Sequence, residues 1–89
     1  MLKNVSTYEE LEAKLLATFC KEFGECNLNS TILWDLGIDV QDLLEFLLRC
    51  DKAFYNCHFE KLEALEVKKF GSVSIKDVCE FLKNELGLR

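Results

Sequence analysis

The sequence has no proline, only four glycines and a single histidine, and basic residues are fewer than acidic ones. Lys and Arg total 11 against 16 Asp and Glu, which gives a net charge of −5. A nucleic-acid-binding protein needs a basic face for the phosphates, so this balance argues against that class. No apolar run approaches the roughly 18 residues of a membrane span. The N-terminal MLKNVSTYEELEAK lacks the apolar segment of a signal peptide.

Motifs for catalysis and metal binding are missing as well. The chain has no GxSxG, HExxH or phosphate-loop motif, so we expect no enzymatic activity. Cys57 and His58 are adjacent soft ligands, but zinc sites use four ligands, usually in CxxC-type or HxxxH-type spacings that do not occur here. Five cysteines without a secretory signal favour reduced thiols and a cytoplasmic location. We therefore expect no catalytic residue, metal or cofactor.

No segment rich in Pro, Gly or Ser divides the chain and no internal repeat is visible, so we expect one domain over residues 1–89. Apolar residues recur with helical spacing, and Thr7, Asp39 and Ser74 supply helix-start signals. The spacing predicts four helices, over about 7–23, 40–55 and 59–67, and from Ser74 to Gly87. The apolar stretch 24–39 is predicted to be a loop folded over the core.

The second predicted helix is the most informative of the four. Its predicted core stripe consists of Leu43, Leu47, Cys50 and Phe54. Leu44 and Leu48 lie beside that stripe and suit either the core or a contact with a partner. The sequence as a whole predicts an all-α, four-helix bundle with a long loop between its first two helices.

Residues 32–54 read ILWDLGIDVQDLLEFLLRCDKAF. This segment resembles the signature of the acyl carrier proteins, an apolar pair followed by Asp-Leu-Gly-x-Asp-Ser-Leu-Asp and then by a helix that ends in Phe. The matching residues are Asp35, Leu36, Gly37, Asp39, Asp42, Glu45 and Phe54. The stretch between Phe54 and Ser74 is several residues longer than in that family. The resemblance implies an acyl-carrier-like bundle.

The resemblance also implies where the chemistry of the family would take place. In acyl carrier proteins the residue after the second Asp is a serine whose hydroxyl carries 4′-phosphopantetheine, and the thiol of that arm holds the acyl chain. Here that residue is Val40, which has no nucleophilic oxygen, and residues 32–71 contain no Ser or Thr that could replace it. The next residue, usually Leu, is Gln41. We therefore expect the fold of a carrier without its reaction.

Negative charge is concentrated around the second predicted helix, where residues 35–51 hold five acids and one arginine. The resemblance implies that this helix docks on basic patches of partner enzymes, where complementary charge sets encounter rate and orientation. Acids near a helix start also suit the macrodipole, which would make them a solvated face and no more. Trp34 would be either an exposed anchor or, as we expect, packed with its loop on the core. The candidate partner-binding residues are Trp34, Asp39, Asp42, Leu44, Glu45 and Leu48.

The leading hypothesis is a monomeric, non-enzymatic interaction or regulatory protein. Its partner would present a basic, partly apolar groove, as on an enzyme that handles acyl chains, and would be neither nucleic acid nor membrane. Two alternatives stay open: a working carrier of fatty-acid or polyketide-type metabolism that is modified by another route, and a helical adaptor unrelated to carriers. A bundle that opens to hold an acyl chain is a further possibility, and it requires a cavity.

Overall fold

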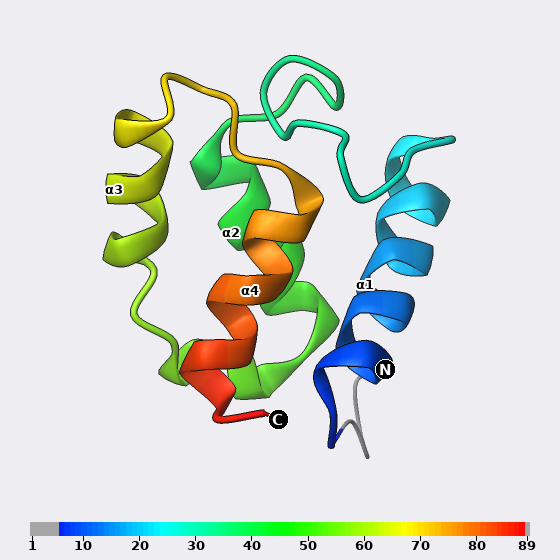
Figure 1. Ribbon diagram of the computed structural model, residues 1–89, viewed down its shortest axis with the longest axis vertical. Coiled ribbons are helices and arrows are strands. Elements are labelled where there is room, and N and C mark those ends of the chain that lie inside the picture. The colour runs from blue at the N-terminus through cyan, green and yellow to red at the C-terminus, as the bar shows by residue number, and fades with distance from the viewer. Residues whose placement is uncertain (1–5, 89) are drawn as a thin grey trace.

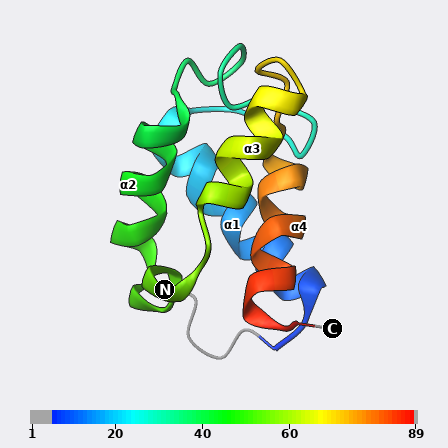
Figure 2. The same cartoon turned by 90° about the vertical axis from the view of Figure 1, so that its left-hand side faces the viewer.

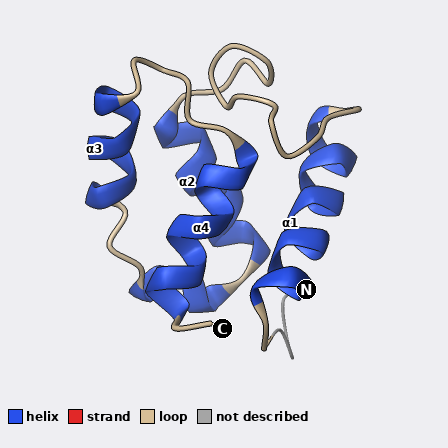
Figure 3. Ribbon diagram, in the orientation of Figure 1, coloured by secondary structure: helices blue, strands red, loops and turns tan. Residues whose placement is uncertain are grey.

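A computed structural model describes residues 6–88 of the chain. Over this range it has four α-helices, one 3₁₀ helix and no strand, so the predicted all-α class is confirmed (Figure 3). The elements are α1 (Tyr8–Phe23), α2 (Val40–Cys50), η1 (Lys52–Asn56), α3 (Glu60–Lys68) and α4 (Ile75–Leu86). No helix in the described range is both long and apolar enough to cross a membrane. Residues 1–5, which contribute to the expectation of no signal peptide, lie outside the description.

The helices form a bundle in which α1 and α3 lie on opposite sides. In Figure 1, α4 runs down the middle, α1 is on the right and α3 is on the left. After the 90° turn of Figure 2, α3 is nearest the viewer and α1 lies behind it. α1 packs mainly against α4, while α2 packs against η1 and α3. The segments that lead into α2 and α4 cross the same end of the bundle (Figure 1).

The helix starts follow from the side chains that the sequence analysis identified. At α1, Thr7 Oγ1 accepts a hydrogen bond from the backbone N of Glu10 at 3.3 Å. At α4, Ser74 and Asp77 bond reciprocally: Asp77 N donates to Ser74 Oγ at 3.2 Å, and Ser74 N donates to Asp77 Oδ2 at 3.0 Å. These bonds satisfy backbone N–H groups that have no partner within the helix, and they fix where each helix begins.

The core is apolar, and every helix contributes to it. Its fully or almost fully buried side chains are Leu11, Leu15, Phe19, Ile32, Leu43, Phe46, Leu47, Phe54, Leu62, Val73, Ile75, Val78, Cys79 and Leu82. Two of them, Ile32 and Val73, come from the connecting segments, and Ile32 N donates a hydrogen bond to Val73 O at 2.8 Å. Ile32 thus holds the segment before α2 against the core, as the apolar character of residues 24–39 predicted.

The second predicted helix is wrong at its C-terminal end, because α2 stops at Cys50 and not near residue 55. Asp51 adopts an extended backbone, and its carboxylate accepts a hydrogen bond from Ala53 N at 2.9 Å. A short acidic side chain that bonds to nearby backbone competes with helix continuation, and here it starts η1 instead. Phe54 reaches the core from η1, whereas Cys50 is only partly buried. The stripe also omitted Phe46, whose exposed fraction is 4%.

Candidate docking surface

The start of α2 is shaped by two of the predicted partner-binding acids. Asp42 N donates to Asp39 Oδ1 at 2.8 Å, and Asp39 N donates to Asp42 Oδ2 at 3.4 Å. Both carboxylates therefore cap the helix, and both are exposed to solvent. Glu45, one turn further along, is exposed and has no hydrogen bond or ion pair with the described residues. Of the three acids, Glu45 alone has no role in folding the helix start.

The two leucines of the predicted set are intermediate between core and surface. Leu44 and Leu48 are both partly buried, and Leu48 packs against the core cluster. Leu48 also lines a shallow hollow together with Glu45, Arg49 and the exposed Tyr55. The structure thus places Leu48 and Glu45 on one face of α2, which is the combination of apolar and acidic groups that the docking hypothesis requires.

Trp34 lies on the surface, which corrects the expectation that it packs on the core. Its exposed fraction is 64%, and that of Leu33 is 41%. Asp35 holds the turn by accepting hydrogen bonds from the backbone N of Thr31 at 2.7 Å and from its hydroxyl at 3.1 Å. Because Ile32 already anchors this tight turn in the core, the two residues that follow it are directed outward.

A second exposed apolar segment lies beside this turn, and the sequence analysis did not identify it. Val67, near the end of α3, is 76% exposed, and Phe70 is 85% exposed with a backbone φ of 55°. Such a positive φ is uncommon for a bulky residue. Gly71 joins the two segments, since a Cβ built on it would lie 2.9 Å from Leu33 Cδ2 and 3.5 Å from Trp34 Nε1. We call Leu33, Trp34 and Val67 the apolar patch.

A groove beside the apolar patch contains Val40, the residue that the resemblance to acyl carrier proteins aligns with their serine. Val40 and Gln41 at the start of α2 line it, opposite Glu63 and Glu66 of α3, and Leu33 and Val67 contribute the apolar part of the wall. Burial raises the pKa of the Glu66 carboxyl. Together with Asp39, these glutamates give the groove an acidic rim beside its apolar wall. This chemistry suits a basic side chain with an apolar neighbour.

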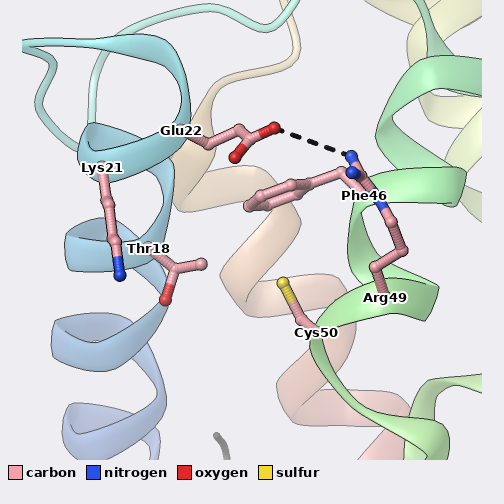
Figure 4. A pocket seen from close by; sticks show the side chains of 6 residues that line it. All are labelled: Thr18, Lys21, Glu22, Phe46, Arg49 and Cys50. Carbon is pink, nitrogen blue, oxygen red and sulfur yellow. Dashed lines mark ion pairs between the residues drawn. The ribbon is translucent and has the colours of Figure 1, made fainter.

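A smaller hollow of about 190 Å³ lies between α1 and α2 (Figure 4). Phe46 and Cys50 of α2 point into it, and Glu22 and Arg49 bridge it through an ion pair at 3.7 Å. The Phe46 ring is held by Phe19 and Phe23, with centroids 4.9 and 5.2 Å away. Small-molecule sites usually measure about 300–1,000 Å³, so this hollow is too small for a long acyl chain.

His58, in the segment that leads into α3, connects that segment to α4. His58 donates to Glu85 Oε1 from its backbone N, and its Nδ1 lies 3.0 Å from the same oxygen. Lys61 Nζ lies 3.6 Å from Glu85 Oε2. These contacts tie the segment before α3 to α4, and the backbone N–H of His58 is the main cause that lowers the pKa of Glu85. Within residues 6–88, no three His, Cys, Asp or Glu side chains are grouped as a metal site would require.

Comparison of the chain with protein-family models, with curated proteins and with solved structures gives no match. The assignment of a function therefore depends on the residues themselves. The six candidate partner-binding residues are together called the docking surface below; they are Trp34, Asp39, Asp42, Leu44, Glu45 and Leu48. The groove and the apolar patch extend this surface from α2 towards α3.

Proposed function

We propose that the chain is a non-enzymatic, acyl-carrier-like interaction module that binds a protein partner through the docking surface. The partner presents a basic, partly apolar groove. The resemblance of residues 32–54 to carrier proteins suggests that this partner is an enzyme that handles acyl chains. The observation that carries the proposal is the exposure of Trp34, in the turn that precedes α2, together with the exposure of Asp39, Asp42 and Glu45 at the start of that helix. A large exposed aromatic ring is typical of a binding anchor.

The proposal includes no phosphopantetheine arm. Val40 occupies the position of the family's serine and lines the groove with its aliphatic side chain, which has no oxygen to esterify. The chain then acts in the cytoplasm by contact with its partner, and it transfers no acyl group. A module of this kind can regulate an acyl-handling enzyme by occupying the surface on which a loaded carrier docks.

The central test is charge reversal at Glu45, because this acid caps nothing. The matched control is Glu80→Lys: Glu80 is also exposed and is also the sixth residue of its helix, α4. The wild type and both variants are immobilised as full chains, and bound proteins are captured from a lysate of the native host and quantified by mass spectrometry. We expect Glu45→Lys to weaken capture of the specific partner by about tenfold, which corresponds to about 1.4 kcal/mol.

The Glu80→Lys variant should capture the partner as the wild type does. Raising the salt concentration should reduce capture by the wild type more than capture by Glu45→Lys, because salt screens exposed charge pairs. Equal capture by the wild type and Glu45→Lys would refute docking through α2. Equal losses in the two lysine variants would show that only the net charge matters.

A second test addresses the missing arm. The wild type is incubated with coenzyme A and a phosphopantetheinyl transferase, and its intact mass is measured beside that of Val40→Ser. The wild type should gain nothing, since no hydroxyl stands at the start of α2. A gain of one phosphopantetheine by Val40→Ser alone would show that the surrounding motif is still recognised. An arm on the wild type would overturn the proposal in favour of a working carrier.

A further inference from the structure

Two thiols of this chain are in contact at the end of α1. Cys20, in the last turn of the helix, and Cys26, in the segment that follows, have their Sγ atoms 2.9 Å apart. Cys20 Sγ also lies 3.3 Å from the backbone O of Cys26. Both residues are free cysteines and both are only partly buried, so the pair is formed by the fold while reagents from solvent can still reach it.

The chain reversal that creates this contact is built into the backbone. Gly24 has a φ of 95°, a conformation that side-chain-bearing residues rarely adopt. Its N–H donates to Cys20 O at 3.0 Å and so closes the last turn of α1. The chain then turns back, and Cys26 returns to the side chain of Cys20. Because Gly24 fixes the turn, the thiols are held near each other before any oxidant arrives.

We propose that Cys20 and Cys26 form a redox-responsive dithiol that closes to a disulfide when a low-molecular-weight disulfide such as oxidised glutathione reacts with it. The S–S bond measures about 2.05 Å, so the sulfurs must approach by less than 1 Å from their present contact. Cys26 belongs to no helix and can supply that movement through its side chain and backbone. The product ties residue 26 to the end of α1.

The reaction is two thiol–disulfide exchanges. The thiolate of one cysteine attacks a sulfur of oxidised glutathione, an S–S bond forms to the protein, and one glutathione leaves as a thiolate. The second cysteine, after losing its proton, attacks the protein sulfur of this mixed disulfide, and the second glutathione leaves. Two protein thiols are oxidised and one small disulfide is reduced to two thiols. The two protons released from the cysteines are taken up by the glutathione thiolates.

The environment of Cys26 sets the speed of this reaction. Burial and the hydrogen bond with Cys20 raise the pKa of Cys26 to about 11. Since the thiolate is the attacking species, closure should be slow at neutral pH and should accelerate as the pH rises towards 11. The proximity of the two sulfurs favours the disulfide at equilibrium, because the second exchange occurs within one molecule.

The sequence allows a direct assay of this bond. Trypsin cleaves after Lys14, Lys21 and Arg49, so a Cys20–Cys26 disulfide joins the peptides 15–21 and 22–49 into one species. The full chain is equilibrated in buffers of increasing oxidised-to-reduced glutathione ratio, remaining thiols are alkylated, and intact mass and tryptic peptides are measured. Cys57→Ser is the control variant, because Cys57 lies before α3 and outside the pair.

We expect the wild type and Cys57→Ser to lose the mass of two hydrogens and to give the linked peptides. They should also gain about 1–2 M in the urea midpoint of unfolding, as expected for a short closed loop. Cys20→Ser and Cys26→Ser should form no such link. Phenylarsine oxide, which bridges neighbouring thiols, should bind the reduced wild type once per chain and should not bind either of those variants.

A disulfide between other cysteines would overturn the proposal. So would a linked species that persists in Cys20→Ser, or a wild type that accumulates only mixed disulfides with glutathione. The link between peptides 15–21 and 22–49 is measured on the unmutated chain, so it decides the matter even where a serine variant folds poorly. The outcome is independent of the docking proposal, because the assay involves no partner.

Discussion

The acids at the start of α2 have a structural role that must be measured before any role in docking. Asp39 Oδ1 accepts a hydrogen bond of 2.8 Å from Asp42 N, whereas the return bond to Asp42 Oδ2 is 3.4 Å long. The first bond is the stronger, so Asp39 is the more important member of the pair. Replacing an N-cap acid by Ala typically costs about 0.5–2 kcal/mol. For Asp39→Ala we expect a loss of about 1 kcal/mol.

Two further variants separate the cap from the charge. Asp39→Ser keeps a capping oxygen and removes the negative charge near the helix start, which is worth about 0.3–1 kcal/mol. Glu45→Gln removes one charge in the second turn, where the macrodipole has little effect, and should change stability by less than 0.5 kcal/mol. The expected order of destabilisation is therefore Asp39→Ala, then Asp39→Ser, then Glu45→Gln.

Thermal unfolding followed by circular dichroism measures this order. For a domain of this size, 1 kcal/mol corresponds to about 4–8 °C in the midpoint, so Asp39→Ala should melt that much below the wild type. If Glu45→Gln melts as low as Asp39→Ala, the loss reflects net charge and the capping argument is wrong. If Asp39→Ser is as unstable as Asp39→Ala, the capping oxygen contributes nothing.

Three other substitutions test the packing and the pH dependence. In urea unfolding, Gly71→Ala should be less stable than Gly37→Ala. Both glycines have a positive φ, but only at Gly71 would the new Cβ meet Leu33, at 2.9 Å. Equal losses of unfolding free energy would mean that backbone strain is the sole cause. Phe46→Ala should cost about 3–5 kcal/mol in the same assay, since its ring is 4% exposed and packs on two rings of α1, and a loss below 1 kcal/mol would contradict that packing. Burial raises the pKa of the Asp77 carboxyl, but the hydrogen bonds that it accepts from Lys69 and Ser74 have the larger effect. The pKa of Asp77 is therefore below its ordinary value. The ionised Asp77 therefore contributes fully to the free energy of unfolding above the ordinary carboxyl pKa of about 3.9, and this contribution is lost as the pH falls through the lower pKa of the folded state. The difference in free energy of unfolding between the wild type and Asp77→Asn should narrow below about pH 4. A difference that widens there would contradict this prediction.

The helices could be predicted from sequence because their causes are local. Thr7 and Ser74 cap residues three positions away, and apolar spacing within a single helix specifies the face that is buried. The end of α2 was mispredicted for a reason that is also local. The apolar periodicity continues as far as Phe54, but the carboxylate of Asp51 accepts a hydrogen bond from the backbone N of Ala53, and the helix ends there.

The candidate surface was less predictable because it depends on contacts between distant parts of the chain. The outward direction of Trp34 depends on Ile32 reaching the core and on Gly71 passing beside the ring. The exposure of Val67 and Phe70 depends on where α3 lies, and no periodicity indicates that. The contact between Cys20 and Cys26 required the turn at Gly24. In each case the spacing along the sequence predicts which residues share one face of a helix. It does not predict which distant residues pack against that face.

Trp34 is the large, exposed aromatic side chain of the docking surface, and it should therefore dominate the affinity. A large aromatic side chain buries about 150–250 Å² when covered. With 64% of Trp34 exposed, a partner that covers it gains about 2–4 kcal/mol at 25 cal/mol per Å². An exposed ion pair at Glu45 contributes about 0.2–1 kcal/mol. The energetic weight of the surface thus lies in the indole ring, and the acid mainly guides the approach.

Kinetics of binding to the captured partner separate these two contributions. Trp34→Ala should weaken the affinity by about two to three orders of magnitude, almost all of it as faster dissociation. Glu45→Gln should mainly slow association, and the effect should vanish at high salt, where exposed charges are screened. Since the ring is exposed, Trp34→Ala should leave the thermal midpoint close to that of the wild type. A Trp34→Ala variant that binds normally would mean that the partner does not cover this ring, and the apolar half of the proposed surface would then be lost.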